Sequence, residues 1–67
     1  MKKSSRPKIG DLITDKFNNY NLGIFVSISI INGYEYCKVF WFQLGGWSWK
    51  YHKDYFYNNI FLYEQNH

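Results

Sequence analysis

Few side chains in this chain have the types and spacing that catalysis or metal binding requires. The only cysteine is Cys37, and the only histidines are His52 and His67. Cys37 falls on the predicted core face of a strand with no base beside it, so a Cys–His nucleophile is not expected. No run of Cys, His, Asp and Glu has the spacing of a structural zinc site. We therefore predict a protein without enzymatic activity, catalytic residues, metal site, cofactor or small-molecule substrate.

The other polar residues are better explained by structural roles than by catalysis or metal binding. Asp11 and Asp15 are four residues apart and could share a loop. Two acids near a strand end far more often cap turns or carry surface charge than act as a general acid and base. His52 is interpreted as a polar strand-end residue, and His67 as part of a frayed terminus.

Basic residues are concentrated at the N-terminus. Lys2, Lys3, Arg6 and Lys8 carry four of the eight positive charges, so the net charge of +3 resides mainly there. Residues 1–7 are polar, contain the only proline and are predicted to form a flexible arm. Two interpretations are open: a solvated terminus that aids solubility, or an arm whose four basic side chains contact phosphate.

The elements that position these residues are organised around residues 22–42. Asn32-Gly33 between two β-rich runs predicts a hairpin with a type I′ turn, because both central residues of that turn need a positive φ. The predicted core-face pairs are Ile30/Glu35, Ile28/Cys37, Val26/Val39 and Ile24/Trp41, and the predicted outer-face pairs are Ser29/Tyr36, Ser27/Lys38, Phe25/Phe40 and Gly23/Phe42.

The outer face of this hairpin is the candidate contact surface. Three phenylalanines on adjacent strands would form a contiguous apolar patch, and such a patch usually meets a partner. Three occupants are open: a cover formed by the N-terminal arm or residues 16–21, a second subunit, or a ligand such as stacked bases or a peptide. The candidate surface comprises Phe25, Phe40, Phe42, Tyr36, Lys38 and Lys50.

The turn around Gly45-Gly46 leads into a further strand and leaves the register of the second hairpin open. If these two glycines alone form the turn, Phe42 faces Trp49 and Lys50 points into the core. If residues 44–46 form it, Trp41/Trp49 and Val39/Tyr51 point inward while Ser48 and Lys50 point outward. We favour the second register because burying an unpaired lysine is costly and burying tryptophan is favourable.

The coarse elements indicate an all-β fold. Strands are predicted over residues 8–14, 22–31, 34–42, 47–52 and 60–63, with a loop over 17–21 and a single 3₁₀ turn within 53–59. Five short strands and tight turns predict a five-stranded, strongly bent antiparallel SH3-like small barrel over residues 8–64, with residues 65–67 frayed. At 67 residues the core is small, and an aromatic content of 24% helps to compensate.

Three short motifs carry a resemblance to a known family. They are Lys8-Ile9-Gly10-Asp11-Leu12-Ile13, Leu22-Gly23-Ile24-Phe25-Val26, and Val39-Phe40-Trp41 followed by Trp49. In these residues the chain resembles the small SH3-like barrel proteins of tailed phages, especially marine ones, and more distantly the KOW, Tudor and Sm-like barrels. The resemblance implies a viral or mobile-element setting and a non-enzymatic role in the particle or in nucleic-acid handling. Neither the aromatic cage of Tudor domains nor the paired RNA-binding motifs of Sm proteins can be placed.

We therefore expect a small β-barrel interaction module that acts through protein–protein contact or self-assembly, with a protein partner or homo-oligomer. The alternative is a nucleic-acid-binding barrel that uses the basic arm and exposed aromatic rings. No signal-peptide pattern and no stretch of roughly 20 apolar residues is present. The expected location is the cytoplasm of a bacterial host, or a virion, without membrane association.

Overall fold

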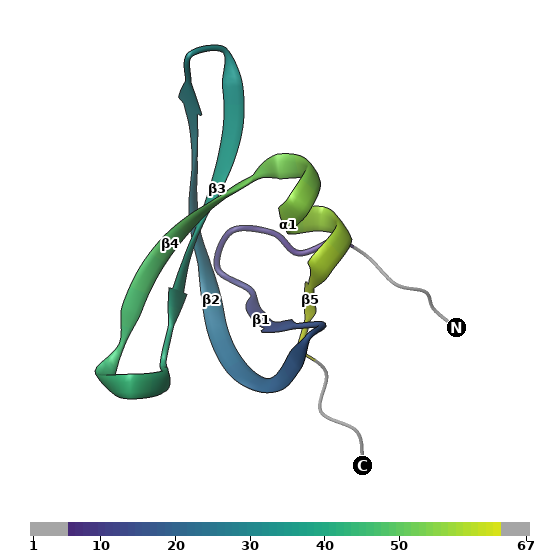
Figure 1. The fold of residues 1–67 in the computed structure, drawn as a ribbon, viewed down its shortest axis with the longest axis vertical. Coiled ribbons are helices and arrows are strands. Elements are labelled where there is room, and N and C mark those ends of the chain that lie inside the picture. Colours follow the sequence, from purple (N-terminus) through teal and green to yellow (C-terminus); the bar gives the residue numbers. More distant parts are fainter. Residues whose placement is uncertain (1–5, 64–67) are drawn as a thin grey trace.

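The computed structural model describes residues 6–63, and within them the chain forms one antiparallel sheet with a short helix against it (Figure 1). An all-β small domain is thereby confirmed. The elements are β1 (Leu12–Asp15), β2 (Asn18–Ile31), β3 (Tyr34–Trp41), the 3₁₀ helix η1 (Gln43–Gly45), β4 (Trp47–His52), α1 (Lys53–Asn59) and β5 (Ile60–Leu62).

The five strands lie in the order β4-β3-β2-β1-β5, so β4 and β5 are the two edges. β2 is 14 residues long and pairs with β3 along one part and with β1 along another. The predicted barrel is corrected to an open sheet, because β4 and β5 do not pair. The chain between them forms α1, which packs against β3, β4 and β5 instead of letting the edges meet (Figure 1).

The Asn-Gly turn prediction is confirmed. Ile31 pairs with Tyr34, and the φ angles are 53° at Asn32 and 83° at Gly33, as a type I′ turn requires. The predicted register then holds from this turn down to the pair Ser27/Lys38. The end of the hairpin is therefore set by local turn chemistry.

Beyond Ser27 the predicted register is wrong, because a β-bulge at Val26 shifts the pairing by one residue. Phe25 pairs with Val39, Ile24 with Phe40 and Gly23 with Trp41. Since an extra residue in one strand reverses its alternation, Phe25 points inward with 1% exposure and Val26 is 41% exposed. The bulge buries the larger side chain of the two, which is the more favourable choice.

The core lies between the sheet and α1. Its buried side chains are Ile13, Phe25, Cys37, Val39, Trp41, Phe56 and Ile60. Phe56 of α1 packs on Phe25 with ring centroids 4.6 Å apart. The predicted 3₁₀ turn is corrected to an α-helix of seven residues, too short to be stable alone and held by this packing. The His52 imidazole caps it by accepting a hydrogen bond from the Asp54 backbone N–H at 3.2 Å.

Two short turns explain where the strands begin. The first strand starts at Leu12 rather than Lys8, because Lys8 to Asp11 form a turn in which the Asp11 carboxylate accepts from the Lys8 backbone N–H at 2.7 Å. Asp15 accepts from the Phe17 backbone N–H at 2.9 Å, and β2 begins at Asn18, where a loop was predicted. The interpretation of both acids as turn caps is confirmed.

Gly23 allows β2 and β3 to approach closely under the Trp41 ring. The sequence predicted that Gly23 pairs with Phe42, and in the structure it pairs with Trp41. A Cβ at Gly23 would lie 2.6 Å from the Phe40 carbonyl oxygen and 2.7 Å from Trp41 Cε3. Because one of these atoms belongs to the backbone, the clash cannot be relieved by a rotamer change alone.

We expect Gly23→Ala to lower the free energy of unfolding by about 3 kcal/mol in urea denaturation, as overpacked sites do. The control is Gly45→Ala, where the new Cβ meets no atom within 4 Å and only the positive φ of 82° adds strain, on the order of 1 kcal/mol. Equal losses for the two variants would contradict the close approach at Gly23.

Candidate functional site

The face of the sheet opposite α1, called here the outer face, is built from rows of paired residues that cross the strands. One row joins Leu12, Ile24, Phe40 and Ser48 across four strands. Neighbouring rows are Ser27/Lys38/Lys50 and Ser29/Tyr36/His52. Because directly paired residues point to the same side, these side chains form one continuous surface.

Lys38 and Lys50 are direct partners in the β3–β4 ladder. Lys50 is exposed and Lys38 is half-buried. Within residues 6–63 neither forms an ion pair, and the described strand residues on the outer face include no Asp or Glu. Like charges placed directly opposite destabilise a sheet, so folding does not account for this pair. The pair leaves two cations free to bind an anionic ligand.

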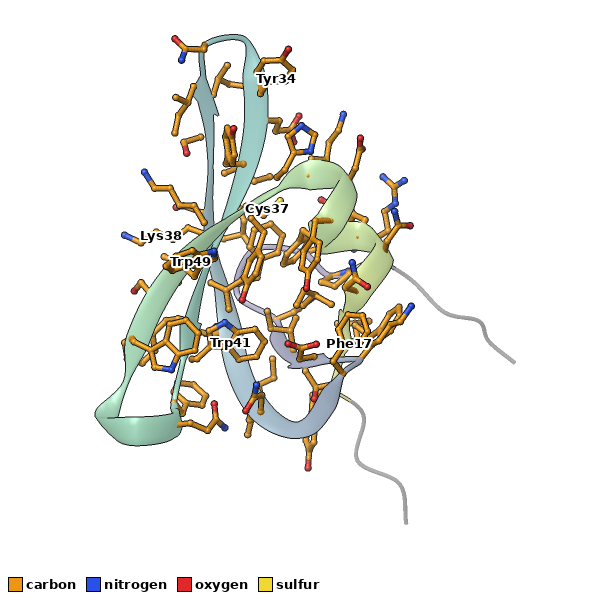
Figure 2. All side chains as sticks on the ribbon, in the orientation of Figure 1. Phe17, Tyr34, Cys37, Lys38, Trp41 and Trp49 are labelled. Atoms are coloured by element: carbon orange, nitrogen blue, oxygen red, sulfur yellow. The ribbon has the colours of Figure 1, made fainter. Side chains whose placement is uncertain are left out.

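A shallow hollow of about 330 Å³ adjoins the lysine pair and is bordered by Lys38, Ser48, Trp49 and Lys50. Figure 2 shows the Lys38 and Trp49 side chains near each other where β4 crosses β3. Trp49 is 58% exposed. An ammonium pair beside an exposed indole ring is suited to a ligand that combines negative charge with a flat apolar group.

The second hairpin explains why Trp49 is exposed. Trp41 pairs with Trp47 and Val39 with Trp49, so the predicted pairs Trp41/Trp49 and Val39/Tyr51 are wrong by two residues along β4. The connection is longer than predicted because η1 lies within it. The outward orientation of Ser48 and Lys50 is confirmed. Trp49 lies on the inner face of the sheet, as predicted, but it sits on an edge strand with no neighbouring strand to cover it.

Apolar side chains occupy one end of the outer face. Phe40 is half-buried and contacts the 45% exposed Phe42 edge-on, with ring centroids 5.7 Å apart. Leu12 and Val26 are exposed nearby on β1 and β2. At the other end the His52 ring contacts the rings of Tyr34 and Tyr36, with centroids 5.8 and 5.7 Å away. The lysine pair thus lies between two groups of rings.

Most of the predicted contact surface is brought together. Tyr36, Lys38, Phe40 and Lys50 share the outer face, and Phe42 joins them through its contact with Phe40. Phe25 is corrected to a core residue, and Ile24 and Val26 take its place on the outer face. The sequence pattern also missed Leu12 and Trp49, because their exposure depends on the bulge and on the position of β4 at an edge.

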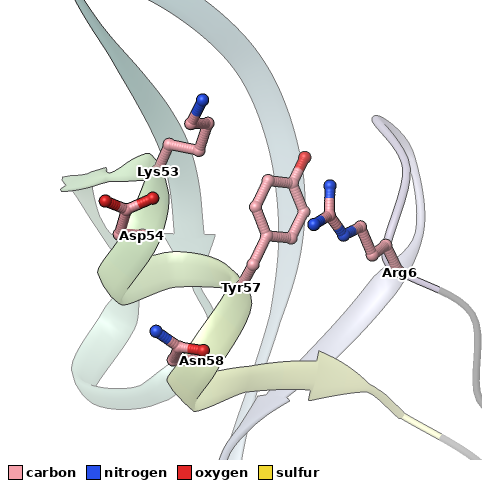
Figure 3. A pocket seen from close by; sticks show the side chains of 5 residues that line it. All are labelled: Arg6, Lys53, Asp54, Tyr57 and Asn58. Carbon is pink, nitrogen blue, oxygen red and sulfur yellow. The ribbon is translucent and has the colours of Figure 1, made fainter.

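Arg6 of the predicted basic arm lies beside α1 and not beside the lysine pair. Arg6 stacks on the Tyr57 ring of α1 at 4.5 Å from its centroid (Figure 3), and Pro7 is buried. These two residues therefore contact the folded domain, where a flexible arm ending at Pro7 was predicted. Lys8 is exposed, and Lys2 and Lys3 lie outside the described residues. The small pocket in Figure 3 is lined by Arg6, Lys53, Asp54, Tyr57 and Asn58.

A hydrogen bond between aromatic side chains holds β4 against β3. Trp41 Nε1 donates to the Tyr51 hydroxyl at 3.0 Å, and Tyr51 stacks on Tyr55 of α1 with centroids 5.5 Å apart. Burial raises the pKa of the Tyr51 hydroxyl, and the hydrogen bond from Trp41 opposes this only in part. The folded state therefore favours the neutral phenol.

This pKa direction predicts how stability depends on pH. The unfolded chain loses the Tyr51 proton near pH 10, while the folded chain retains it to higher pH. The folded state then binds more protons, so the free energy of unfolding falls as the pH rises above about 10. We expect this fall, measured by urea denaturation between about pH 9 and 11, to be shallower in Tyr51→Phe. An unchanged slope would contradict the assignment.

Cys37 and His52 lie in the core and at the end of β4, respectively. Burial raises the pKa of the Cys37 thiol, the Glu35 charge acts in the same direction, and a hydrogen bond with Tyr57 opposes both. Cys37 is thus a fully buried thiol of the core. The interpretation of His52 as a strand-end residue is confirmed. Among residues 6–63 no group of three or more His, Cys, Asp or Glu could hold a metal ion, and no helix there could span a membrane.

No protein-family model, curated protein or solved structure matches this chain. Function is therefore inferred from the outer face itself.

Proposed function

We propose that this protein is a non-enzymatic binding module that holds single-stranded nucleic acid on the outer face of its sheet. The observation that carries this proposal is the directly paired Lys38 and Lys50, with no carboxylate among the described strand residues of that face and with aromatic rings on both sides. Single strands bind to surfaces that combine cations for the phosphates with rings on which bases stack.

Each group of the outer face has a distinct role in this proposal. The two lysines contact successive phosphates, and the Ser48 hydroxyl beside them donates a hydrogen bond to a phosphate oxygen. Phe42, which is exposed, and Tyr36, which is half-buried, provide stacking surfaces for bases. Since stacking and phosphate contacts do not distinguish bases, we expect weak sequence preference.

The structure favours a single strand over a duplex as the ligand. A two-stranded ribbon can enter the major groove of DNA, and the β2–β3 hairpin is such a ribbon. Its end, residues 30–35, contains Glu35 and no lysine or arginine, so it does not suit a polyanionic groove. Exposed rings are useful only where bases are unpaired.

The resemblance to phage SH3-like barrels agrees with this proposal, since it implies a role in the particle or in nucleic-acid handling. We also propose that the fold is an open form of that topology. In support, four consecutive strands follow one another as neighbours, and β5 returns beside β1 after a short helix. Protein–protein contact is a second candidate role, favoured by a different feature, the unpaired edge of β4.

The test is fluorescence anisotropy with labelled oligothymidylate and oligouridylate of about 12 nucleotides. We expect binding that weakens on the order of sevenfold between ~50 and ~200 mM salt, as two phosphate contacts on a single strand require. The matched duplex should bind more weakly. Absence of binding at low salt, or an affinity that salt does not change, would overturn the proposal.

A further inference from the structure

The outer edge of β4 is free along its whole length. β4 pairs with β3 from Trp47 to His52, and no described backbone group forms a hydrogen bond to its other side. Natural proteins usually protect such an edge with charged side chains, a proline, a bulge or a covering segment, because unpaired N–H and C=O groups recruit another strand. β4 has one charged residue, Lys50, but neither a proline nor a bulge, and its Trp47 and Trp49 are exposed.

We propose that β4 pairs antiparallel with β4 of a second copy of this chain, about a twofold axis perpendicular to the sheet. Two sheets of five strands would then join into one continuous sheet. Such an interface is isologous, since the same strand contributes to both sides. This proposal does not depend on the nucleic-acid role.

The register of the pairing follows from the faces of β4. Direct partners share a face, and this axis keeps the outer face of one copy continuous with that of the other. Trp49 can therefore lie opposite Trp49 of the second copy, or Lys50 opposite Lys50. The second register would place two ammonium groups together, so the first is favoured.

In the favoured register the strand is complementary to itself. Trp49 faces its counterpart and Trp47 faces Tyr51, which brings aromatic side chains together on the inner face. Ser48 faces Lys50 on the outer face, so no like charges are opposed. This match favours a second copy over an unrelated peptide. A small domain also gains stability from association, because its own core is limited.

The pairing would also extend the outer face. The Lys38–Lys50 pairs of the two copies would lie on either side of the twofold axis, with Lys38 of one copy about 15 Å from Lys38 of the other across three strand spacings. A single strand could then cross both pairs.

The first test is sedimentation velocity of the full chain without nucleic acid. We expect a dimer at micromolar concentration and at least tenfold weaker association for Trp49→Lys, which places like charges opposite each other. The matched control is Tyr34→Lys, since Tyr34 is 60% exposed and Trp49 58%, but Tyr34 lies at the far end of β3. A monomeric wild type, or equal effects of the two substitutions, would overturn the proposal.

The second test fixes the register by disulfide cross-linking. Ser48→Cys and Lys50→Cys proteins are oxidised separately and after mixing. Direct partners are close enough for a disulfide, whereas diagonal neighbours lie roughly 7–8 Å apart. Cross-linked dimer should therefore form severalfold more in the mixture than in either protein alone. Cys37 is fully buried and does not compete. Cross-linking of Lys50→Cys alone, or none in the mixture, would contradict this register.

Discussion

Replacing both Lys38 and Lys50 by alanine is expected to lower the affinity for a single-stranded oligothymidylate by about tenfold at low salt, and to flatten the dependence of that affinity on salt. The two ammonium groups are direct ladder partners and have no ion-pair partner within the part of the chain that the structure describes. Their removal relieves a repulsion in the sheet, so the variant should remain folded. Anisotropy titrations at several salt concentrations measure both effects.

The matched control removes two cations from the opposite side of the domain. Arg6→Ala with Lys16→Ala changes the net charge by the same amount, but Arg6 stacks on Tyr57 of α1 and Lys16 lies beside the end of α1. We expect this variant to retain most of the wild-type affinity and salt slope. Equal losses in the two variants would show that net charge, rather than the outer face, drives binding.

Phe25→Ala is expected to lower the free energy of unfolding by about 4 kcal/mol, enough to unfold much of a domain this small. Phe25 is 1% exposed and packs on Phe56, so alanine would leave a cavity between the sheet and α1. Val26→Ala, at the adjacent exposed position, should change stability by about 0.5 kcal/mol or less. Urea denaturation followed by circular dichroism measures both.

Phe25→Leu keeps this prediction testable if the alanine variant does not fold. It should lower stability by about 1–2 kcal/mol, still more than Val26→Ala. A larger loss at Val26 than at Phe25 would mean that the strand continues without a bulge and that Phe25 faces outward.

The sequence predicted the features that depend on local chemistry. Asn32-Gly33 set the turn, Asp11 and Asp15 capped turns, and β4 spans the predicted residues 47–52. Lys50 points outward because burying an unpaired ammonium group is costly. Each of these outcomes depends on one side chain or on its nearest neighbours in the chain.

The bulge could not be predicted, because residues 24–26 are Ile-Phe-Val. Apolar side chains would point into the core whether the strand continued its alternation or reversed it there. The choice is made by Phe56, a residue far along the chain that packs on Phe25. Phe56 also turns residues 53–59 into a helix, and that helix lies between the edges of the open sheet. The exposure of Trp49 follows in turn, since an open sheet leaves β4 at an edge.

The observed contact surface therefore differs from the predicted one at the residues beside the bulge. Ile24 and Val26 replaced Phe25, while the lysine pair kept its predicted face because it lies on the hairpin side of the bulge. The surface consequently loses the Phe25 ring but keeps its pair of cations. This difference is why nucleic acid, the alternative in the sequence interpretation, becomes the proposed ligand.

The most direct test of the proposed site is a ¹H–¹⁵N correlation spectrum of the protein titrated with oligothymidylate. The proposal predicts shifts of the Lys38, Ser48 and Lys50 amides, with little change at Arg6 and Tyr57 beside α1. Shifts confined to the Arg6–Tyr57 side, or no shifts at ligand concentrations that saturate the anisotropy, would contradict a nucleic-acid site on the outer face.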